Sequence, residues 1–142
     1  EYTRKKGVNR TIGFTAQFYT WQKGISLVEG KYDVIIKSRF DVIHSSPFDF
    51  DFINPSKFGC IEACPHPFTD FTFFGNQEIM EDVMYNMYDL VEKRDLKLQN
   101  YSNYHKYPLG LIAESFVLGY IDKKGYGYQP LVEKYTKIGL RL

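Results

Sequence analysis

The chain has 142 residues, of which 44% are hydrophobic and 18% aromatic, and this is enough apolar material for one packed domain. Its 18 basic and 17 acidic residues give a formal net charge of only +1, so the charge balance favours neither nucleic acid nor an anionic membrane as a partner. No apolar stretch approaches the roughly 18 residues that a membrane span needs, and no signal peptide opens the sequence. The two cysteines are too few for a disulfide scaffold, which predicts a cytoplasmic protein.

The first predicted element is a helix, indicated by apolar residues that recur every three or four positions. Its buried face would carry Phe14, Phe18, Trp21, Ile25 and Val28. Gly30 stands where such a helix would stop. Strands are predicted next over residues 32–43, 58–63 and 70–74. The first strand is apolar on both faces at its centre, as expected when helices cover both sides of a sheet.

A second helix is predicted with Asn76 as its N-cap and Glu78 in its first turn. Its apolar face would carry Ile79, Val83 and Met87, with Met80, Met84 and Val91 beside them. Residues 93–106 are polar and rich in tyrosine, which predicts a long loop. A third helix is predicted over residues 108–121, ended by the polar segment 122–125. These elements indicate an α/β fold with a mixed, mostly parallel sheet flanked by helices.

The run over residues 32–43 turns from apolar to charged toward its carboxyl end. Lys37, Arg39 and Asp41 would share one face there, because side chains alternate along a strand. Ligands of open α/β sheets collect beyond the carboxyl ends of strands. Asp41 is therefore a candidate ligand for Mg²⁺ or Mn²⁺ on a nucleotide diphosphate, and Arg39 or Lys37 a candidate phosphate contact. The alternative is an Arg39–Asp41 pair that only keeps the sheet edge soluble.

Two further sets of candidate ligands fit a metal less well. Asp49-Phe50-Asp51 spells D-x-D, but it alternates with phenylalanines and predicts a half-buried edge strand whose acids face water. Cys60, Cys64 and His66 lack a second pair of zinc ligands. We interpret the two cysteines as buried free thiols.

Three blocks carry a resemblance to a known family. Residues 17–43 read QFYTWQKGISLVEGKYDVIIKSRFDVI, residues 70–91 read DFTFFGNQEIMEDVMYNMYDLV, and residues 108–121 read PLGLIAESFVLGYI. In this order they resemble the GT-A-like glycosyltransferases of bacteria and large DNA viruses. In that family a helix with FYS-x-x-K leads into a strand ending YD-x-V-I-R-x-R-x-D. A D-x-F-x-F-G-x-x-E-x-M block follows, and the closing helix begins with His-Pro-Glu. The blocks cover about half of the chain.

The resemblance implies a GT-A-like, Rossmann-related fold and a metal-assisted glycosyltransferase. Such an enzyme moves a sugar from a nucleotide-diphosphate donor to a glycan or protein hydroxyl, with Mn²⁺ or Mg²⁺ as cofactor. Arg39-x-Asp41 stands in the place of the D-x-D motif, so Asp41 would hold the metal and the diphosphate. Asp70 and Glu114 are the candidate catalytic residues by this resemblance, Glu114 through contacts with the acceptor or the metal. Asp70 and the backbone around Gly75 would line the sugar or acceptor pocket.

The chain departs from the family pattern at three places. Arg39 replaces the first acid of D-x-D and leaves one carboxylate for the metal, and the histidine of His-Pro-Glu is missing before Glu114. Only residues 1–13 stand before the first predicted helix, where the family has a nucleotide-binding βα unit. We therefore expect residues 1–142 to form a single glycosyltransferase-like domain that either lacks part of this unit or is an abbreviated relative.

The same residues allow a second interpretation without catalysis. The 12 phenylalanines, 12 tyrosines and 1 tryptophan would form the recognition surface of a carbohydrate-binding or protein-interaction module. In this interpretation Asp70 is a turn residue before a strand, and Glu114 lies on a solvated helix face. Trp21 falls on the apolar stripe of the first helix and is predicted to belong to the core.

Overall fold

The computed structural model describes residues 8–40, 42–43, 50–61, 72–92, 113–131 and 139–140. The helical elements of this part of the chain are α2 (Val8–Ile25), η1 (a 3₁₀ turn, Phe50–Phe52), α3 (Gln77–Glu92) and α4 (Ala113–Lys124). Its strands are β1 (Ile35–Ser38), β2 (Val42–Ile43), β3 (Lys57–Ile61), β4 (Thr72–Gly75), β5 (Gly127–Leu131) and β6 (Gly139–Leu140).

The main sheet is mixed, with the strand order β1-β4-β3-β5, and β2 pairs separately with β6. β4 is antiparallel to both β1 and β3, and β3 is parallel to β5. The α/β class is confirmed, but the prediction of a mostly parallel sheet is wrong. Only residues 62–71 connect β3 to β4, whereas a connection between parallel neighbours needs about a dozen residues or more, usually with a helix.

The strand predicted over residues 32–43 is divided between the two sheets. β1 ends at Ser38, and Val42–Ile43 form β2, which pairs with β6. Between them, Arg39 and Phe40 are exposed, and the Phe40 side chain is fully so. The apolar centre of the run is confirmed as strand. Side chains alternate between the two faces of this strand only as far as Ser38, so the prediction that Lys37 and Arg39 share a strand face does not extend to Arg39.

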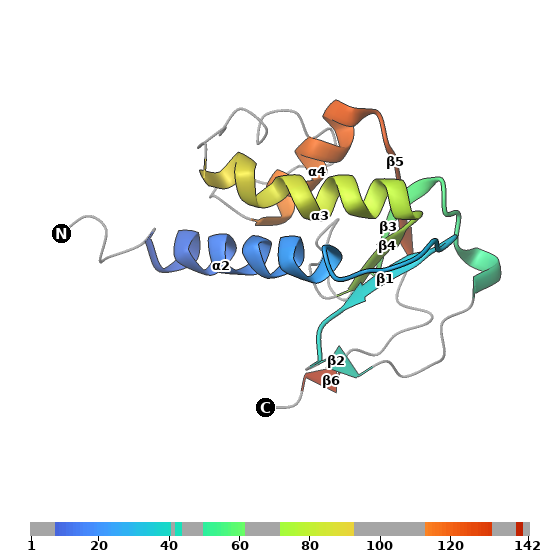
Figure 1. Ribbon diagram of the computed structural model, residues 1–142, viewed down its shortest axis with the longest axis horizontal. Coiled ribbons are helices and arrows are strands. Elements are labelled where there is room, and N and C mark those ends of the chain that lie inside the picture. The colour runs from blue at the N-terminus through green and yellow to red at the C-terminus, as the bar shows by residue number, and fades with distance from the viewer. Residues whose placement is uncertain are drawn as a thin grey trace.

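The helices pack together on one face of the main sheet. Figure 1 shows α2 and α3 side by side and running in opposite directions, with α4 beside α3. The apolar faces predicted for the first two helices are confirmed for their described members. The core formed by the helices and the sheet contains Phe18, Trp21, Ile25, Phe58, Cys60, Phe73, Ile79, Met80, Val83, Met84, Met87, Phe116, Val117, Leu118, Tyr120 and Ile121.

The start of α3 and the end of α4 follow the predicted local signals, whereas α2 ends at Ile25, five residues before the predicted stop at Gly30. The Asn76 side chain accepts a hydrogen bond from the backbone N–H of Ile79 at 2.9 Å, as an N-cap residue does. α4 ends before Gly125, whose φ of 73° lies in the left-handed region that favours glycine. The backbone N–H of Tyr126 closes that end by donating to the carbonyl of Ile121 at 3.1 Å. α4 begins at Ala113, and residues 108–112 of the predicted helix lie outside the described residues.

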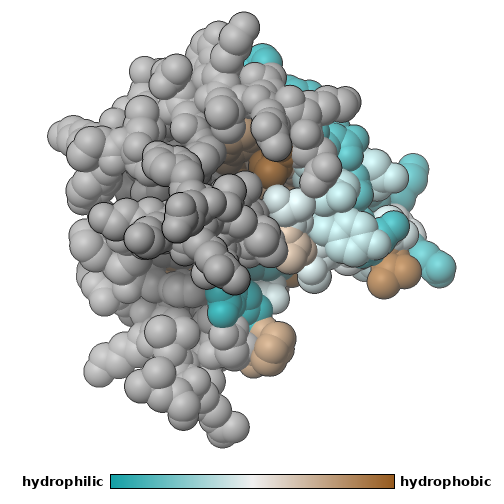
Figure 2. Space-filling view, turned by 90° about the vertical axis from the view of Figure 1, so that its left-hand side faces the viewer, coloured by the Kyte–Doolittle hydropathy of each residue, from teal (hydrophilic) through white to brown (hydrophobic). Residues whose placement is uncertain are grey.

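The surface of the described part shows scattered hydrophobic side chains. On the face drawn in Figure 2 they are separated by hydrophilic residues and do not gather into one patch. None of the described helices combines the length and the apolar character that crossing a membrane requires.

On the face of the main sheet that carries Phe74, neighbouring strands are in close contact. Phe74 is fully buried and pairs with Gly59. A Cβ atom on Gly59 would lie 2.1 Å from the Phe74 ring. The sheet therefore needs glycine at this position, because a buried aromatic ring occupies the space of any side chain.

We predict that Gly59→Ala lowers the free energy of unfolding by about 1–3 kcal/mol, the usual cost of overpacking a core. Urea unfolding measures the change. Gly24→Ala is the matched control, because a Cβ atom there meets nothing within 4 Å. Gly24 lies within α2, where alanine is favoured over glycine by up to about 1 kcal/mol. Equal stability of the Gly59→Ala variant and wild type would contradict this packing.

Candidate functional site

The first candidate site lies where β1 leaves the sheet. Ser38, the last residue of β1, pairs with Thr72, the first residue of β4. Their hydroxyl groups are hydrogen-bonded at 3.0 Å, and Thr72 is fully buried. Because the strands are antiparallel, the positions that lead toward Asp41 and out of Asp70 meet at one end of the sheet. Asp41 and Asp70 themselves lie outside the described residues.

Lys37 brings a positive charge to this end of the sheet. Its ammonium nitrogen lies 5.0 Å from the ring centroids of both Trp21 and Phe73. These two rings meet edge to face, with centroids 4.7 Å apart and planes at 60°. Trp21 is 3% exposed, so its assignment to the core is confirmed. Lys37 is half-buried and belongs to this aromatic corner, formed by Trp21 and Phe73, as well as to the sheet edge.

Arg39 adds a second cation directly after β1. Its side chain is exposed. A lysine and an arginine two positions apart at the end of a strand form an environment that attracts phosphate oxygens, the arginine by paired hydrogen bonds and the lysine as a point charge. The described part of this end therefore carries two cationic side chains.

Gly75 and Glu114 are placed differently. Gly75 pairs with Ile35 at the opposite end of β4 from Thr72, about 10 Å away along the strand. A Cβ atom on Gly75 would lie 3.3 Å from the Ile79 side chain, so the space there is narrow. Glu114 is in the first turn of α4, and its side chain lies outside the described residues. The fold thus joins the Lys37–Arg39 end with the neighbours of Asp41 and Asp70, and keeps Gly75 apart.

A hollow lies near the start of β1, where Ile35 pairs with Gly75. It is open to solvent, has a volume of about 450 Å³, and is lined by Leu27, Val28, Glu29, Tyr32, Val34 and Ile35. Most of this lining is apolar, and the Leu27 side chain is 78% exposed.

The other predicted ligand sets have the following positions. Asp51 lies in the 3₁₀ turn Phe50–Phe52, so the edge strand expected there is wrong. The backbone N–H of Ile53 closes this turn on the carbonyl of Phe50 at 3.1 Å. Cys60 is a buried free thiol as predicted, 2.8 Å from the Tyr128 hydroxyl. Cys64, His66 and Asp49 are outside the described residues. Within the described ranges, no group of three or more His, Cys, Asp or Glu side chains could hold a metal.

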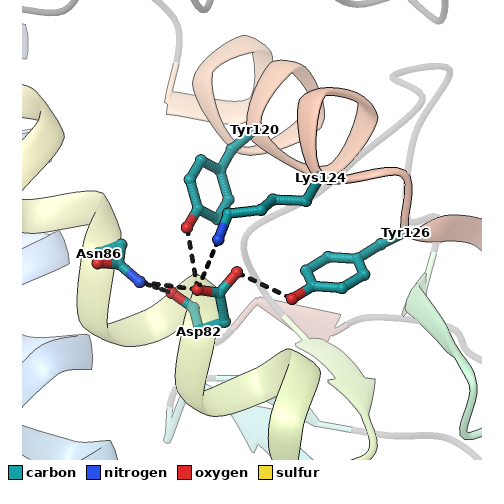
Figure 3. A network of polar contacts seen from close by, with 5 residues as sticks. All are labelled: Asp82, Asn86, Tyr120, Lys124 and Tyr126. Atoms are coloured by element: carbon teal, nitrogen blue, oxygen red, sulfur yellow. Dashed lines mark hydrogen bonds and ion pairs between the residues drawn. The ribbon is translucent and has the colours of Figure 1, made fainter.

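A second polar cluster is centred on Asp82 of α3 (Figure 3). Its Oδ1 accepts hydrogen bonds from Tyr120 at 3.1 Å, from Lys124 at 3.1 Å and from Asn86 at 2.9 Å. Its Oδ2 accepts one from the Tyr126 hydroxyl at 3.0 Å. The donors come from α3, from α4 and from the residue before β5. One carboxylate thus ties three parts of the chain together.

The three titratable donors of this cluster, Tyr120, Lys124 and Tyr126, have raised pKa values. Burial, together with the hydrogen bond to Asp82, raises the pKa of Tyr126 to about 12. Burial also raises the pKa of Tyr120, and the charge of Asp82 adds to this effect. Hydrogen bonds to Tyr120 and Asp82 raise the pKa of Lys124. All three groups therefore favour their protonated forms in the folded state.

Sequence reasoning missed this cluster. Asp82 and Asn86 are four residues apart, as are Tyr120 and Lys124, and each pair has the pattern of an ordinary solvated helix face. The sequence of each helix alone carries no signal for the cluster, because both helices have further polar and charged residues. Only the packing of α3 against α4 brings the pairs together.

Comparison of the chain with protein-family models, curated proteins and solved structures found no match.

We predict that Tyr126→Phe changes the dependence of stability on pH. The pKa of Tyr126 is about 12 in the folded state against 10.0 for a free tyrosine. Its stabilising effect is therefore complete below about pH 10 and is lost as the pH rises from about 10 to about 12. The variant should be less stable by about 1 kcal/mol at neutral pH. It should also lose less stability than wild type between pH 10 and pH 12, as measured by urea unfolding at each pH.

Tyr85→Phe is the control for this measurement. Tyr85 lies on the same helix as Asp82, and its side chain is 52% exposed. Its variant should follow the wild-type curve. If Tyr126→Phe lost stability as steeply as wild type over this interval, the assigned role of the hydroxyl would be wrong.

Proposed function

We propose that this chain is the diphosphate-binding part of a GT-A-like glycosyltransferase, which moves a sugar from a nucleotide-diphosphate donor to a glycan or protein hydroxyl. The observation that carries the proposal is the pairing of Ser38 with Thr72. This register brings Ser38, three residues before Asp41, and Thr72, two residues after Asp70, to one end of the sheet, although 28 residues separate the two aspartates in the sequence. The resemblance places the donor at the same end.

The cations at this end suit a leaving diphosphate. Negative charge grows on the diphosphate as the bond to the sugar breaks, and preorganised positive charge stabilises it. Lys37 is fixed over two buried rings, and Arg39 follows directly after the strand. Asp41 would hold Mn²⁺ or Mg²⁺, which neutralises part of the same charge when bound. A single carboxylate is sufficient if the diphosphate oxygens and water complete the coordination, as is usual for Mg²⁺.

The remaining candidates would serve other parts of the reaction. Asp70 would act on the sugar or the acceptor close to the diphosphate. Gly75 lies about 10 Å along the strand from Thr72 and about 7 Å from Phe73, the partner of Lys37. It pairs with Ile35, which lines the open hollow. We assign this end to the acceptor or the sugar, and Glu114 to the acceptor or the metal, following the family pattern.

A non-catalytic carbohydrate-binding or protein-interaction module is the second candidate, favoured by exposed aromatic side chains. Five of the described ones are more than half exposed: Tyr32 at 53%, Phe40 at 104%, Phe50 at 62%, Phe52 at 51% and Tyr85 at 52%. Exposed aromatic rings can stack on sugar faces or anchor a protein partner. Such binding would require neither a metal nor a nucleotide.

We predict that Asp41→Asn abolishes the Mn²⁺-dependent binding of a nucleotide diphosphate to the 142-residue chain. The amide keeps the shape of the side chain but removes the charge that attracts the cation. Calorimetric titration with UDP and with GDP, each with Mn²⁺ and with EDTA, measures the effect. Asp51→Asn is the matched control: this aspartate belongs to the literal D-x-D but lies in the 3₁₀ turn, and its variant should bind as wild type does.

Two outcomes would contradict the proposal. Unchanged Mn²⁺-dependent binding by Asp41→Asn would remove the role given to this residue. Glycan binding that is indifferent to both EDTA and nucleotide, with no nucleotide binding, would favour the module instead.

A further inference from the structure

We propose that the open hollow between the end of α2 and the start of β1 is a docking site for a basic peptide segment of a partner protein. An aliphatic or aromatic side chain of the partner enters the hollow, and a neighbouring lysine or arginine pairs with Glu29, which belongs to the lining. The inference is carried by this hollow and does not rest on the proposed transferase activity. It goes beyond that activity by assigning a class of partner to this surface.

The apolar part of the hollow has a half-buried floor and an exposed rim. Val28 and Ile35 are partly buried and pack against the core, so they form the floor. Leu27 is 78% exposed and Tyr32 is 53% exposed, and both belong to the same lining. An apolar side chain that rests on the floor is removed from water. The rim side chains lose their exposure only when a larger body covers them.

The connection that forms the hollow is held in place by α3. Figure 1 shows it passing beside the start of this helix. The Gln77 side chain accepts a hydrogen bond from the backbone N–H of Tyr32 at 2.9 Å and donates one to the carbonyl of Gly30 at 3.1 Å. Gly30 has a φ of 98°, and the Tyr32 ring lies 3.6–3.8 Å from where its Cβ atom would be. A partner therefore has little of this connection to order when it binds.

The shape of the hollow favours a side chain of a larger partner over a free small molecule. Its volume of about 450 Å³ is that of a small-molecule pocket. Such pockets enclose most of their ligand, whereas this hollow is open to solvent. A side chain that projects from a protein brings with it the surface that closes the open side. Anchor residues of protein interfaces fill pockets in this way and are surrounded by contacts that exclude water.

The charges around the hollow select a basic partner. The Glu29 side chain is exposed, and no hydrogen bond or ion pair within the described part of the chain occupies its carboxylate. A second carboxylate, that of Glu81, accepts a hydrogen bond from Gln77 at 2.6 Å. Lys31 and Asp33 are exposed in the same connection and offset each other. The surplus of negative charge attracts a cationic segment and repels nucleic acid and anionic lipid.

The test is a titration of the full 142-residue chain with labelled synthetic peptides, followed by fluorescence polarisation. The basic probe carries two leucines between pairs of lysine and arginine, and the acidic probe carries the same leucines between glutamates. A third probe replaces the leucines of the basic peptide by serines. We expect saturable binding of the basic probe, and binding of the other two that is weaker by about tenfold or more.

Two variants separate the apolar contact from the charge. Leu27→Ser should weaken binding of the basic probe about tenfold, because it removes an exposed apolar contact. Glu29→Lys should weaken the basic probe and strengthen the acidic one, a reversal that damage to the fold would not produce. Asp51→Lys is the matched control, since it changes the net charge equally from the 3₁₀ turn and should bind as wild type does. Circular dichroism and thermal unfolding verify that each variant is folded.

The outcomes decide the inference separately from the proposed function. Absence of saturable binding of the basic probe to wild type would overturn it, as would undiminished binding by Leu27→Ser. Equal effects of Glu29→Lys and Asp51→Lys would also overturn it, because they would show attraction to the net charge alone. Peptide binding by a chain that binds no nucleotide would support the docking site and count against the transferase. Nucleotide binding by a chain that binds no peptide would do the reverse.

Discussion

The arrangement of this protein depends on the packing of Phe73 at the centre of the main sheet. This residue pairs with Lys37 on one side and with Cys60 on the other, and its ring contacts those of Trp21 and Phe58. It therefore joins the central strand to both neighbouring strands and to α2. Phe74, the next residue, fills the opposite face above Gly59. The two consecutive phenylalanines thus pack on opposite faces of the sheet. Because Phe73 pairs with Lys37, its packing also determines the position of the end of β1.

The sequence predicted the elements of this fold better than their pairing. The spacing of Phe18, Trp21 and Ile25 identified the buried face of α2, because one face of a helix recurs every three or four residues whatever the helix packs against. An apolar run such as Val34–Ile36 shows that a strand is covered on both faces, but it does not give the direction of the neighbouring strand. β5 was missed because Gly127 and Pro130 are poor strand formers. Proline is tolerated there because β5 is at the edge of the sheet.

The candidate site was predictable in its composition and not in its geometry. Alternation along a strand identified Lys37 and Arg39 as charges at its carboxyl end. The pairing of Ser38 with Thr72 joins residues 34 positions apart, and no local pattern encodes such a register. Trp21 was predicted as a core residue, which is confirmed, and Lys37 as a candidate phosphate contact. Their proximity was not predicted: the long lysine stem lets the ammonium lie over the buried indole.

The Asp82 carboxylate leaves little hydrogen-bonding capacity for a ligand. A carboxylate has about four lone-pair sites, and the oxygens of Asp82 accept hydrogen bonds from Asn86, Tyr120, Lys124 and Tyr126. Its hydrogen-bonding capacity is thus used within the fold, where it joins α3 to α4 and to the start of β5. The ammonium of Lys37 lies over two ring faces at the end of β1. We assign a role in rigidity to the Asp82 cluster, because its carboxylate is occupied by donors from three parts of the chain.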